Sequence, residues 1–346
     1  MPPRLIALIS LLLVLSAAAG KVFTFGDSLS DTGNVFSISG GIYPPSPYFE
    51  GRFSNGKVWV EHLAAELGRP ADSLARLDGG RNYAVGGSET TGTLSSQLTS
   101  FQLDLGFNTL GSDDLCILWI GGNDILNGTS AVPAEMITRV ENFLNALSLR
   151  NARRFLLVNL PDLSKIPPEI GTPSAALTRA RSIDYNTRLA TLVAGINNQS
   201  GKSAVLIDVF SMFEEITARP QAYGFSTATE SAYDRDTGAL VSNPERFIFW
   251  DDRHPTAVTH RLIGQLAAQM YLKRTGFIPI HTGTFDGNLV ASWILPWDLV
   301  SLQVEASSTL LVGSWGSSGL AEPTNGRFFS IARPLATGPN FFRLRR

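Results

Sequence analysis

The sequence predicts an α/β protein, with a parallel sheet covered by helices on both faces, followed by a small all-β module. Two observations carry this prediction. Short apolar runs alternate with segments whose apolar residues recur at helical spacing, which is typical of strand–helix–strand units. This alternation ends near Gly276, and helical spacing is absent from Asn288 onward. We therefore expect two units of different architecture in the 346-residue chain.

The predicted strands of the first unit are short and mostly apolar, as strands buried on both faces are. They are expected at residues 22–25, 82–85, 114–120, 155–159 and 204–208. The predicted helices cover residues 57–67, 94–103, 133–149, 174–197 and 256–273. Right-handed crossovers leave few topologies for such a chain. We expect a flavodoxin-like, three-layer arrangement with the first strand near the middle of the sheet.

The C-terminal segment alternates polar and apolar residues, as half-buried strands do. Strands are expected at residues 301–306, 328–332 and 340–344. We therefore predict a small β module at residues 285–346, after a first domain at residues 20–276. The alternative is a β extension packed onto the first domain.

The first 19 residues resemble a secretory signal rather than part of the fold. Arg4 precedes an apolar run at residues 5–15, and small residues follow at 16–20. This run is shorter than the ~20 residues that a membrane span needs. We expect a signal peptide at residues 1–19 and a secreted protein, extracellular or periplasmic. An uncleaved N-terminal anchor is the alternative.

Charge and cysteine content exclude several classes of function. The net charge of −2 provides no basic field for nucleic acid. The only cysteine, Cys116, lies in an apolar segment and is expected to be a small buried hydrophobe, without an internal disulfide. We expect a small-molecule or carbohydrate ester as partner, with no nucleic acid and no stable membrane span.

A serine follows the first predicted strand. The apolar run at residues 22–25 ends in Gly26 and Asp27, and Ser28 comes next. The carboxyl ends of parallel strands form the edge of the sheet where open α/β proteins bind ligands. The hydroxyl of Ser28 is therefore a candidate nucleophile, provided that a base can reach it.

The candidate base lies far downstream. Asp251 and His254 are three residues apart, just after the apolar run at residues 247–250. On a tight turn, a carboxylate can reach an imidazole at this spacing. Pro255 disfavours helical geometry at His254, which sets the ring at the entrance to the last predicted helix. Short Asp–His spacings are common, however, and many are simply solvated.

A serine nucleophile also needs hydrogen-bond donors for the developing oxyanion. Asn123 follows the strand at 114–120 and two glycines, Gly121 and Gly122, which permit close backbone approach. Gly86 and Gly87 follow another predicted strand, where a glycine can present a bare N–H. Each motif alone is consistent with an ordinary turn. Together, their polar groups fall where one crevice would form.

The combination resembles the GDSL, or SGNH, hydrolases of the secreted esterase and lipase type. The motifs that carry the resemblance, in the family's order, are Gly26-Asp27-Ser28-Leu29-Ser30, the glycine of 84–88, Gly121-x-Asn123-Asp124 and Asp251-x-x-His254. The segment at residues 48–59 also looks like the one that follows the nucleophile in these esterases. The common Gly-x-Ser-x-Gly elbow is absent from the sequence, which disfavours an ordinary α/β-hydrolase fold.

The resemblance implies Ser28 as nucleophile, His254 as base and Asp251 as the group that orients His254. It also implies an oxyanion hole from the backbone N–H groups of Ser28 and Gly87 and the side chain of Asn123. The register of the glycine stays open, because Gly86 and Gly87 are adjacent. No metal or organic cofactor is expected, and the alternative of a metal site would use Asp251, His254 and His260.

We therefore expect a secreted serine esterase that acts on acetylated carbohydrates or small acyl esters through an acyl-Ser28 intermediate. One alternative is a lipase or phospholipase acting on longer acyl chains, and another is an idle scaffold that binds glycans. Aromatic residues near the expected crevice could stack on sugar rings, line an acyl pocket, or serve only packing: Tyr43, Tyr48, Phe49, Phe53 and Trp250.

Overall fold

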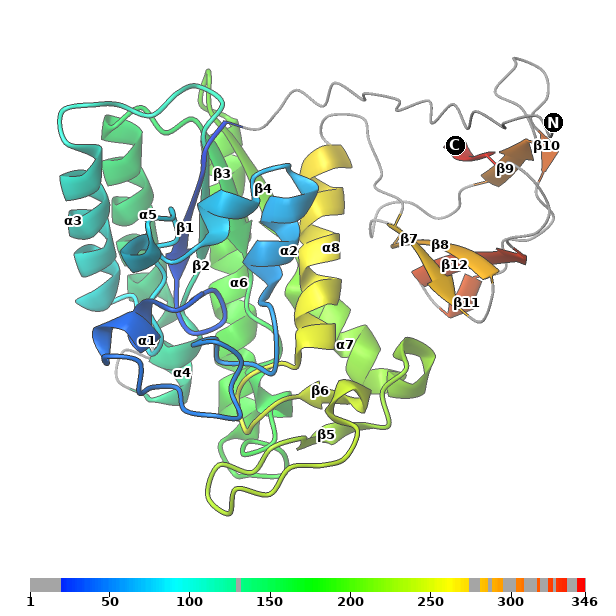
Figure 1. The fold of residues 1–346 in the computed structure, drawn as a ribbon. Coiled ribbons are helices and arrows are strands. Elements are labelled where there is room, and N and C mark those ends of the chain that lie inside the picture. The colour runs from blue at the N-terminus through cyan, green and yellow to red at the C-terminus, as the bar shows by residue number, and fades with distance from the viewer. Residues whose placement is uncertain are drawn as a thin grey trace, which may run out of the picture.

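A four-stranded parallel sheet forms the centre of the first unit (Figure 1). The computed structural model describes residues 20–128, 132–273 and the C-terminal strands named below, so the predicted signal peptide lies outside the described residues. The strands are β1 (Val22–Gly26), β2 (Leu115–Trp119), β3 (Arg154–Val158) and β4 (Ser203–Ile207), paired in that order. Gly26 lies opposite Trp119, so β1 and β2 end at one edge.

The strand expected at residues 82–85 is not formed, and that prediction was wrong. Asn82 makes isolated parallel bridges to Thr24, on the side of β1 away from β2, and to Ala75. The backbone carbonyls of Asn82 and Ala84 accept hydrogen bonds from the side-chain amide of Asn34. These carbonyls are therefore satisfied locally, without a further strand.

In the order β1-β2-β3-β4, β1 is the edge strand of this sheet, so the expectation that it lies near the middle was wrong. The segment at 82–85 covers the free edge of β1 in part, because the N–H groups of Tyr83 and Val85 donate to the carbonyls of Thr24 and Gly26.

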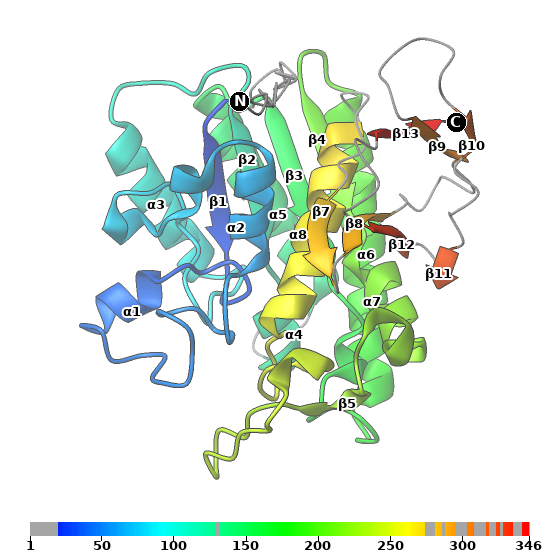
Figure 2. The same ribbon diagram turned by 45° about the vertical axis from the view of Figure 1, so that its right-hand side comes forward.

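Helices cover both faces of the sheet, which confirms the predicted fold class (Figure 2). Trp59 of α2 packs edge-on against Trp119 of β2, whereas Phe25 of β1 packs against Phe143 of α5. The helices expected from apolar spacing are α2 (Trp59–Glu66), α3 (Thr93–Leu105), α5 (Pro133–Leu149), α6 (Ala175–Asn197) and α8 (Ala257–Lys273). Helices α2 and α8 lie together over one face, and α5 and α6 lie together over the other.

Several short elements were not expected from the sequence. They are α1 (Asn34–Ile38), α4 (Gly122–Leu126), α7 (Val209–Ala218), β5 (Thr227–Ser231), β6 (Phe247–Phe249) and the 3₁₀ turns at Pro70–Ser73, Arg76–Asp78, Leu163–Lys165, Pro220–Tyr223 and Pro244–Arg246. Helix α7 begins where the Asp208 carboxylate accepts the Ser211 N–H, which satisfies one free donor of its first turn. Cys116 is buried and free, as expected.

The described C-terminal strands pair in antiparallel fashion, as expected for an all-β module. They are β7 (His281–Phe285), β8 (Asn288–Ile294), β9 (Gln303–Ser307), β10 (Gly316–Ser317), β11 (Pro323–Asn325), β12 (Phe328–Pro334) and β13 (Phe341–Arg345). Their orders are β11-β12-β8-β7 and β10-β9-β13. The domain boundaries at 20–276 and 285–346 stay predictions.

None of the helices in the described ranges has both the length and the apolar character needed to cross a membrane.

Candidate active site

The turn that carries Ser28 depends on a glycine at the end of β1. Gly26 has a φ of +149°, and a Cβ placed on it would lie 2.3 Å from the carbonyl oxygen of Trp119. A larger residue would therefore clash with the backbone of β2. The Gln97 side chain of α3 accepts the N–H of Gly26 at 3.0 Å and donates to its carbonyl at 2.7 Å. These contacts hold Ser28 at the edge of the sheet.

Ser28, His254 and Asp251 form one continuous hydrogen-bonded chain. The Nε2 atom of His254 lies 2.8 Å from the Oγ atom of Ser28, although 226 positions separate the two residues. The Nδ1 atom of His254 lies 2.9 and 2.8 Å from the two carboxylate oxygens of Asp251. An ionised carboxylate only accepts, so Nδ1 carries the proton and Nε2 accepts the Ser28 hydroxyl. This is the geometry that a serine and its general base require.

Asp251 is fully buried and accepts several hydrogen bonds. Its Oδ1 atom accepts the backbone N–H groups of Arg253 at 2.8 Å and His254 at 2.7 Å. Its Oδ2 atom accepts the Tyr48 hydroxyl at 2.6 Å. Burial alone would raise the pKa of Asp251, but the His254 imidazole and these donors outweigh burial and hold the pKa well below its usual value. Asp251 is therefore ionised at neutral pH.

Besides the N–H of Ser28, the proposed oxyanion donors come from the segments that contain Gly87 and Asn123. Asn123 is the second residue of α4, which begins directly after Gly121, and its side-chain nitrogen donates to the Ser88 carbonyl at 3.0 Å. That bond uses one amide hydrogen and leaves the second for another acceptor. The N–H of Gly86 donates to Asp31 at 2.9 Å, whereas Gly87 has a φ of +77°, a conformation that favours glycine. The occupied Gly86 N–H therefore favours Gly87 as the donor.

Ser28, Asn123 and His254 line a common cavity of about 60 Å³, and Gly87 is not among its lining residues. The remaining wall is largely apolar. It includes Leu29, Trp119, Leu126, Pro161, Leu163, Ile166, Phe213, Phe249 and Pro255. A small apolar cavity beside a nucleophile suits a short hydrocarbon group.

The aromatic residues singled out in the sequence do not line this cavity. Tyr48 and Trp250 pack edge-to-face, and Phe53 lies against the His254 ring with ring centroids 5.3 Å apart. Tyr43 is half exposed. Of the alternatives given for these side chains, the contacts of Tyr48, Trp250 and Phe53 favour packing over an acyl pocket. The wall comes instead from elements whose approach to Ser28 has no local sequence signal.

Tyr48 is the partner of the Asp251–His254 pair that sequence reasoning missed. Its hydroxyl contact with Asp251 joins residues 203 positions apart. No spacing rule in one sequence relates such positions. The sequence placed Tyr48 among the aromatic residues near the expected crevice, and the segment at 48–59 resembles the one that follows the nucleophile in the family, but neither observation predicted a contact with Asp251.

Metal coordination has no support in the described ranges, where no group of three or more His, Cys, Asp or Glu side chains could hold an ion. The Nδ1 atom of His260 instead accepts the backbone N–H of Trp59 at 3.3 Å. Burial, reinforced by the nearby His62 and His254, lowers the pKa of His260 to about 3, so this ring is neutral.

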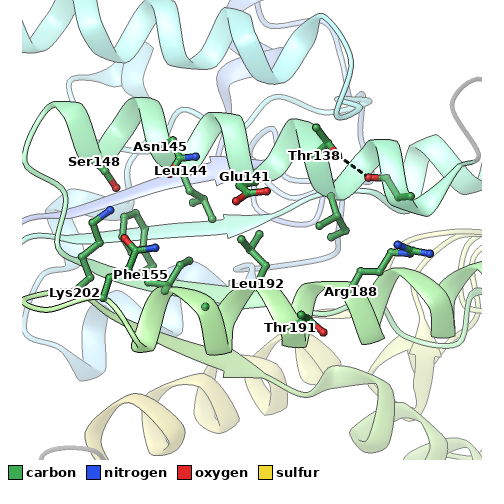
Figure 3. Close-up of a pocket in the computed structure, with 15 residues that line it drawn as sticks. Thr138, Glu141, Leu144, Asn145, Ser148, Phe155, Arg188, Thr191, Leu192 and Lys202 are labelled. Atoms are coloured by element: carbon green, nitrogen blue, oxygen red, sulfur yellow. Dashed lines mark hydrogen bonds between the residues drawn. The ribbon is translucent and has the colours of Figure 1, made fainter.

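A larger groove elsewhere in the molecule is not lined by the Ser28–His254–Asp251 group. A groove of about 510 Å³ runs between α5 and α6, where Glu141, Arg188 and Lys202 lie along its sides (Figure 3). None of the predicted site residues lines this groove. Size alone therefore does not identify the site in this molecule.

Asp27, beside the candidate nucleophile, is a buried carboxyl group that is costly to ionise. It is 2% exposed, and its Oδ1 atom accepts the N–H of Leu29 at 3.0 Å. Burial raises the pKa of Asp27 from 3.8 to about 7, against the smaller effect of that hydrogen bond. Burial also raises the pKa of Asp31 and of Asp124.

Replacing Asp27 with asparagine is expected to stabilise the protein clearly more at pH 8 than at pH 5. A carboxyl group whose pKa is higher in the folded state favours unfolding above that pKa, and the penalty fades as the pH falls from about 7 towards 3.8. The removed penalty is of the order of 4 kcal/mol at pH 8, or about 5–10 °C in Tm. Thermal unfolding of Asp27→Asn at both pH values checks this, with the exposed Asp236→Asn as control. Equal gains at both pH values would contradict it.

Fold and site together define a class of protein. A parallel sheet with helices on both faces presents a Ser–His–Asp constellation at the carboxyl edge of its strands, and such constellations recur among serine hydrolases of unrelated folds. The model of the GDSL-like lipase/acylhydrolase family matches residues 22–267, and the chain belongs to this family. It is accordingly an enzyme of a family of carboxylic ester hydrolases and acyltransferases.

Two relatives illustrate the similarity. The chain is 31% identical over 272 residues to the thermolabile hemolysin of Vibrio parahaemolyticus, with 71% of this chain and 62% of that protein covered. It is 28% identical over 307 residues to the phosphatidylcholine-sterol acyltransferase of Aeromonas hydrophila, with 72% and 90% covered. The chain thus spans under two thirds of the length of the hemolysin.

Among solved structures, an acetylxylan esterase from Geobacillus stearothermophilus, Axe2, is 16% identical, with a TM-score of 0.42 and coverage of 75% of this chain and 95% of that one.

Proposed function

We propose that the protein is a secreted serine esterase that hydrolyses carboxylic esters of short acyl groups through an acyl-Ser28 intermediate. The contact of 2.8 Å between the Oγ atom of Ser28 and the Nε2 atom of His254 carries the proposal. It joins a hydroxyl to a base that the ionised Asp251 orients. An idle glycan-binding scaffold would have no need of this alignment.

The proposed reaction has two stages. In the first, Nε2 of His254 takes the Ser28 proton as Oγ bonds to the ester carbonyl carbon. The carbonyl oxygen becomes an oxyanion, which accepts hydrogen bonds from the backbone N–H groups of Ser28 and Gly87 and the side chain of Asn123. His254 then protonates the departing alcohol as its bond to carbon breaks. In the second stage, His254 deprotonates water, which attacks the acyl-serine and releases the acid and Ser28.

The cavity beside Ser28 supports a short acyl group. A space of about 60 Å³ holds about four to six water-sized groups, which is roughly the room for a short hydrocarbon chain. Its apolar wall contributes to binding by removing hydrocarbon from water. Acetylated carbohydrates and other small acyl esters both have acyl groups short enough for this cavity. The size of the cavity restricts the acyl group of the ester and not its alcohol.

A lipase or phospholipase acting on longer acyl chains is the second candidate. The names of the two relatives, a hemolysin and an acyltransferase that uses phosphatidylcholine, favour it. In this alternative, the chain would extend beyond the small cavity along the protein surface.

Ester chain length separates the two candidates. We expect kcat/KM for 4-nitrophenyl esters to be highest for the acetate or butyrate and to fall more than about tenfold by the palmitate, because long chains exceed the cavity. Phe213→Ala should shift the optimum to longer chains, since Phe213 lines the cavity. Ile216→Ala, a buried change on the same helix outside the cavity wall, is the matched control. An optimum at the palmitate in the parent enzyme would favour the lipase.

Export is part of the proposal and has its support in the sequence alone. Arg4, the apolar run at 5–15 and the small residues at 16–20 form the pattern of a cleavable signal.

A further inference from the structure

We infer that Tyr48 is a positioning residue for the proposed reaction, and that its hydroxyl holds the Asp251 carboxylate in the plane that orients His254. The inference rests on the proposed function and deepens it. Tyr48 does not line the cavity that contains Ser28, so it acts through Asp251 rather than on the ester itself.

The two oxygens of Asp251 are held by different parts of the chain. Oδ1 accepts two backbone N–H groups from its own turn, those of Arg253 and His254. Oδ2 accepts the Tyr48 hydroxyl at 2.6 Å and faces Nδ1 of His254 at 2.8 Å. Without the phenol, Oδ2 keeps only the imidazole donor among these contacts. The carboxylate could then rotate about its Cβ–Cγ bond at lower cost.

Tyr48 is suited to act as a fixed donor. Burial and the adjacent Asp251 carboxylate both raise the pKa of the phenol, which therefore keeps its proton at neutral pH. A neutral phenol beside an ionised carboxylate must donate. Such a charge-assisted bond is stronger than a bond between neutral groups.

An aromatic cluster fixes the ring of Tyr48. Trp250 and Tyr233 each meet the ring edge-to-face, and Tyr233 stacks on Trp250 at an interplanar angle of 19°. Trp250 directly precedes Asp251, so the same aromatic cluster contacts the Tyr48 ring and adjoins the carboxylate that accepts the Tyr48 hydroxyl. Five residues beyond Tyr48, Phe53 lies against the ring of His254. One loop thus contacts both members of the Asp251–His254 pair.

The loop is itself anchored to the turn that carries His254. The hydroxyl of Ser54 donates to the Pro255 carbonyl at 2.8 Å, and the backbone N–H of Phe49 donates to the Ser54 carbonyl at 2.9 Å. These bonds join the loop to the residue that follows His254. The position of the Tyr48 hydroxyl therefore depends on contacts independent of Asp251, as a positioning role requires.

Other ionisable groups also act on His254 or on its carboxylate partner and would influence a pH profile. They are Asp27 and His260, which interact with His254, together with Arg235, which interacts with Asp251 and forms an ion pair with Asp252. A comparison of variants that leave these groups unchanged isolates the effect of Tyr48.

The test is Tyr48→Phe, which removes the hydroxyl and keeps the ring. We expect kcat for 4-nitrophenyl butyrate to fall about tenfold or more and KM to change by less than about threefold, since the lost bond is to a charged group that acts in the chemical step. The acid limb of kcat/KM should move to higher pH, because a carboxylate with one donor fewer stabilises the imidazolium more strongly. Tyr233→Phe, in the same cluster, is the matched control and should move neither quantity.

A double-mutant cycle with Asp251→Asn separates positioning from a general loss of structure. We expect Tyr48→Phe to cause little further loss in the Asp251→Asn background. The rate of Ser28 labelling by a fluorophosphonate and the Tm of each variant are measured in parallel, so that a misfolded variant is recognised. Unchanged kcat and pH profile in folded Tyr48→Phe, or an equal loss in both backgrounds, would overturn the inference. Turnover that survives Ser28→Ala would instead overturn the proposed function.

Discussion

Replacing Ser28 with alanine is expected to lower kcat by about five to six orders of magnitude. The change removes the oxygen that would bond to the acyl carbon, and the loss of a serine nucleophile has this order of effect in other hydrolases. The remaining rate would come from binding and from the oxyanion donors, which the substitution leaves in place. Ester hydrolysis and fluorophosphonate labelling of the purified variant measure the effect. The fold should persist, because the side chain is small and lies at the edge of the sheet.

Ser30→Ala is the matched control for this prediction. Ser30 lies in the same turn, but its hydroxyl accepts the Trp59 indole N–H at 3.1 Å rather than facing His254. We expect this variant to lose stability and to keep turnover. Hydrolysis that persists in Ser28→Ala at more than about a hundredth of the parent rate would refute the assignment of the nucleophile.

Replacing Asp251 with asparagine is expected to lower kcat by about ten thousand-fold, the second largest effect. Asparagine can donate to Nδ1 of His254 and so favours the tautomer whose Nε2 carries the proton, and that tautomer cannot accept the Ser28 proton. The substitution also removes the negative charge that stabilises the imidazolium. Steady-state kinetics of the variant check the magnitude. We expect KM to change little, because Asp251 does not line the cavity.

Asp252→Asn is the matched control, since it removes an adjacent carboxylate that forms an ion pair with Arg235 instead of contacting His254. This half-exposed pair should contribute little to activity or stability. Similar losses in the Asp251→Asn and Asp252→Asn variants would mean that general electrostatics, and not orientation of His254, explains the effect.

Local patterns in the sequence predicted the elements with long apolar periodicity. Helix α5 was expected at residues 133–149 and has those bounds in the structure, because Pro133 sets its first turn and its apolar residues recur at helical spacing. Residues 82–85 have the composition of a strand and donate backbone N–H groups to β1, but they form no continuous ladder, because the N–H of Gly26 donates to the Gln97 side chain instead of to this segment. Helix α4 was missed because it is only five residues long, follows Gly121 and begins at a second glycine, Gly122.

In the candidate site, too, some residues could be predicted from local sequence patterns and others could not. The residue types of Ser28, Asn123, Asp251 and His254, with their places after predicted strands, could be identified as candidates from the sequence. The Asp251–His254 contact could also be predicted, since only three positions separate the two residues on one turn. The apolar wall, with Phe213 and Ile166, was not predictable, and neither was the donor Tyr48. Each of these depends on how distant loops pack above the sheet.

Local periodicity and residue chemistry were enough to predict the alternating elements, the edge of the sheet at which Ser28 lies and the chemical groups available there. Which of these groups contact one another became known from the folded chain. Contacts across 226 positions between Ser28 and His254, and across 203 between Tyr48 and Asp251, arise when packing of the sheet and helices brings separate loops together. No local sequence pattern predicts contacts between residues so far apart in the chain, because these contacts depend on the burial of the whole core.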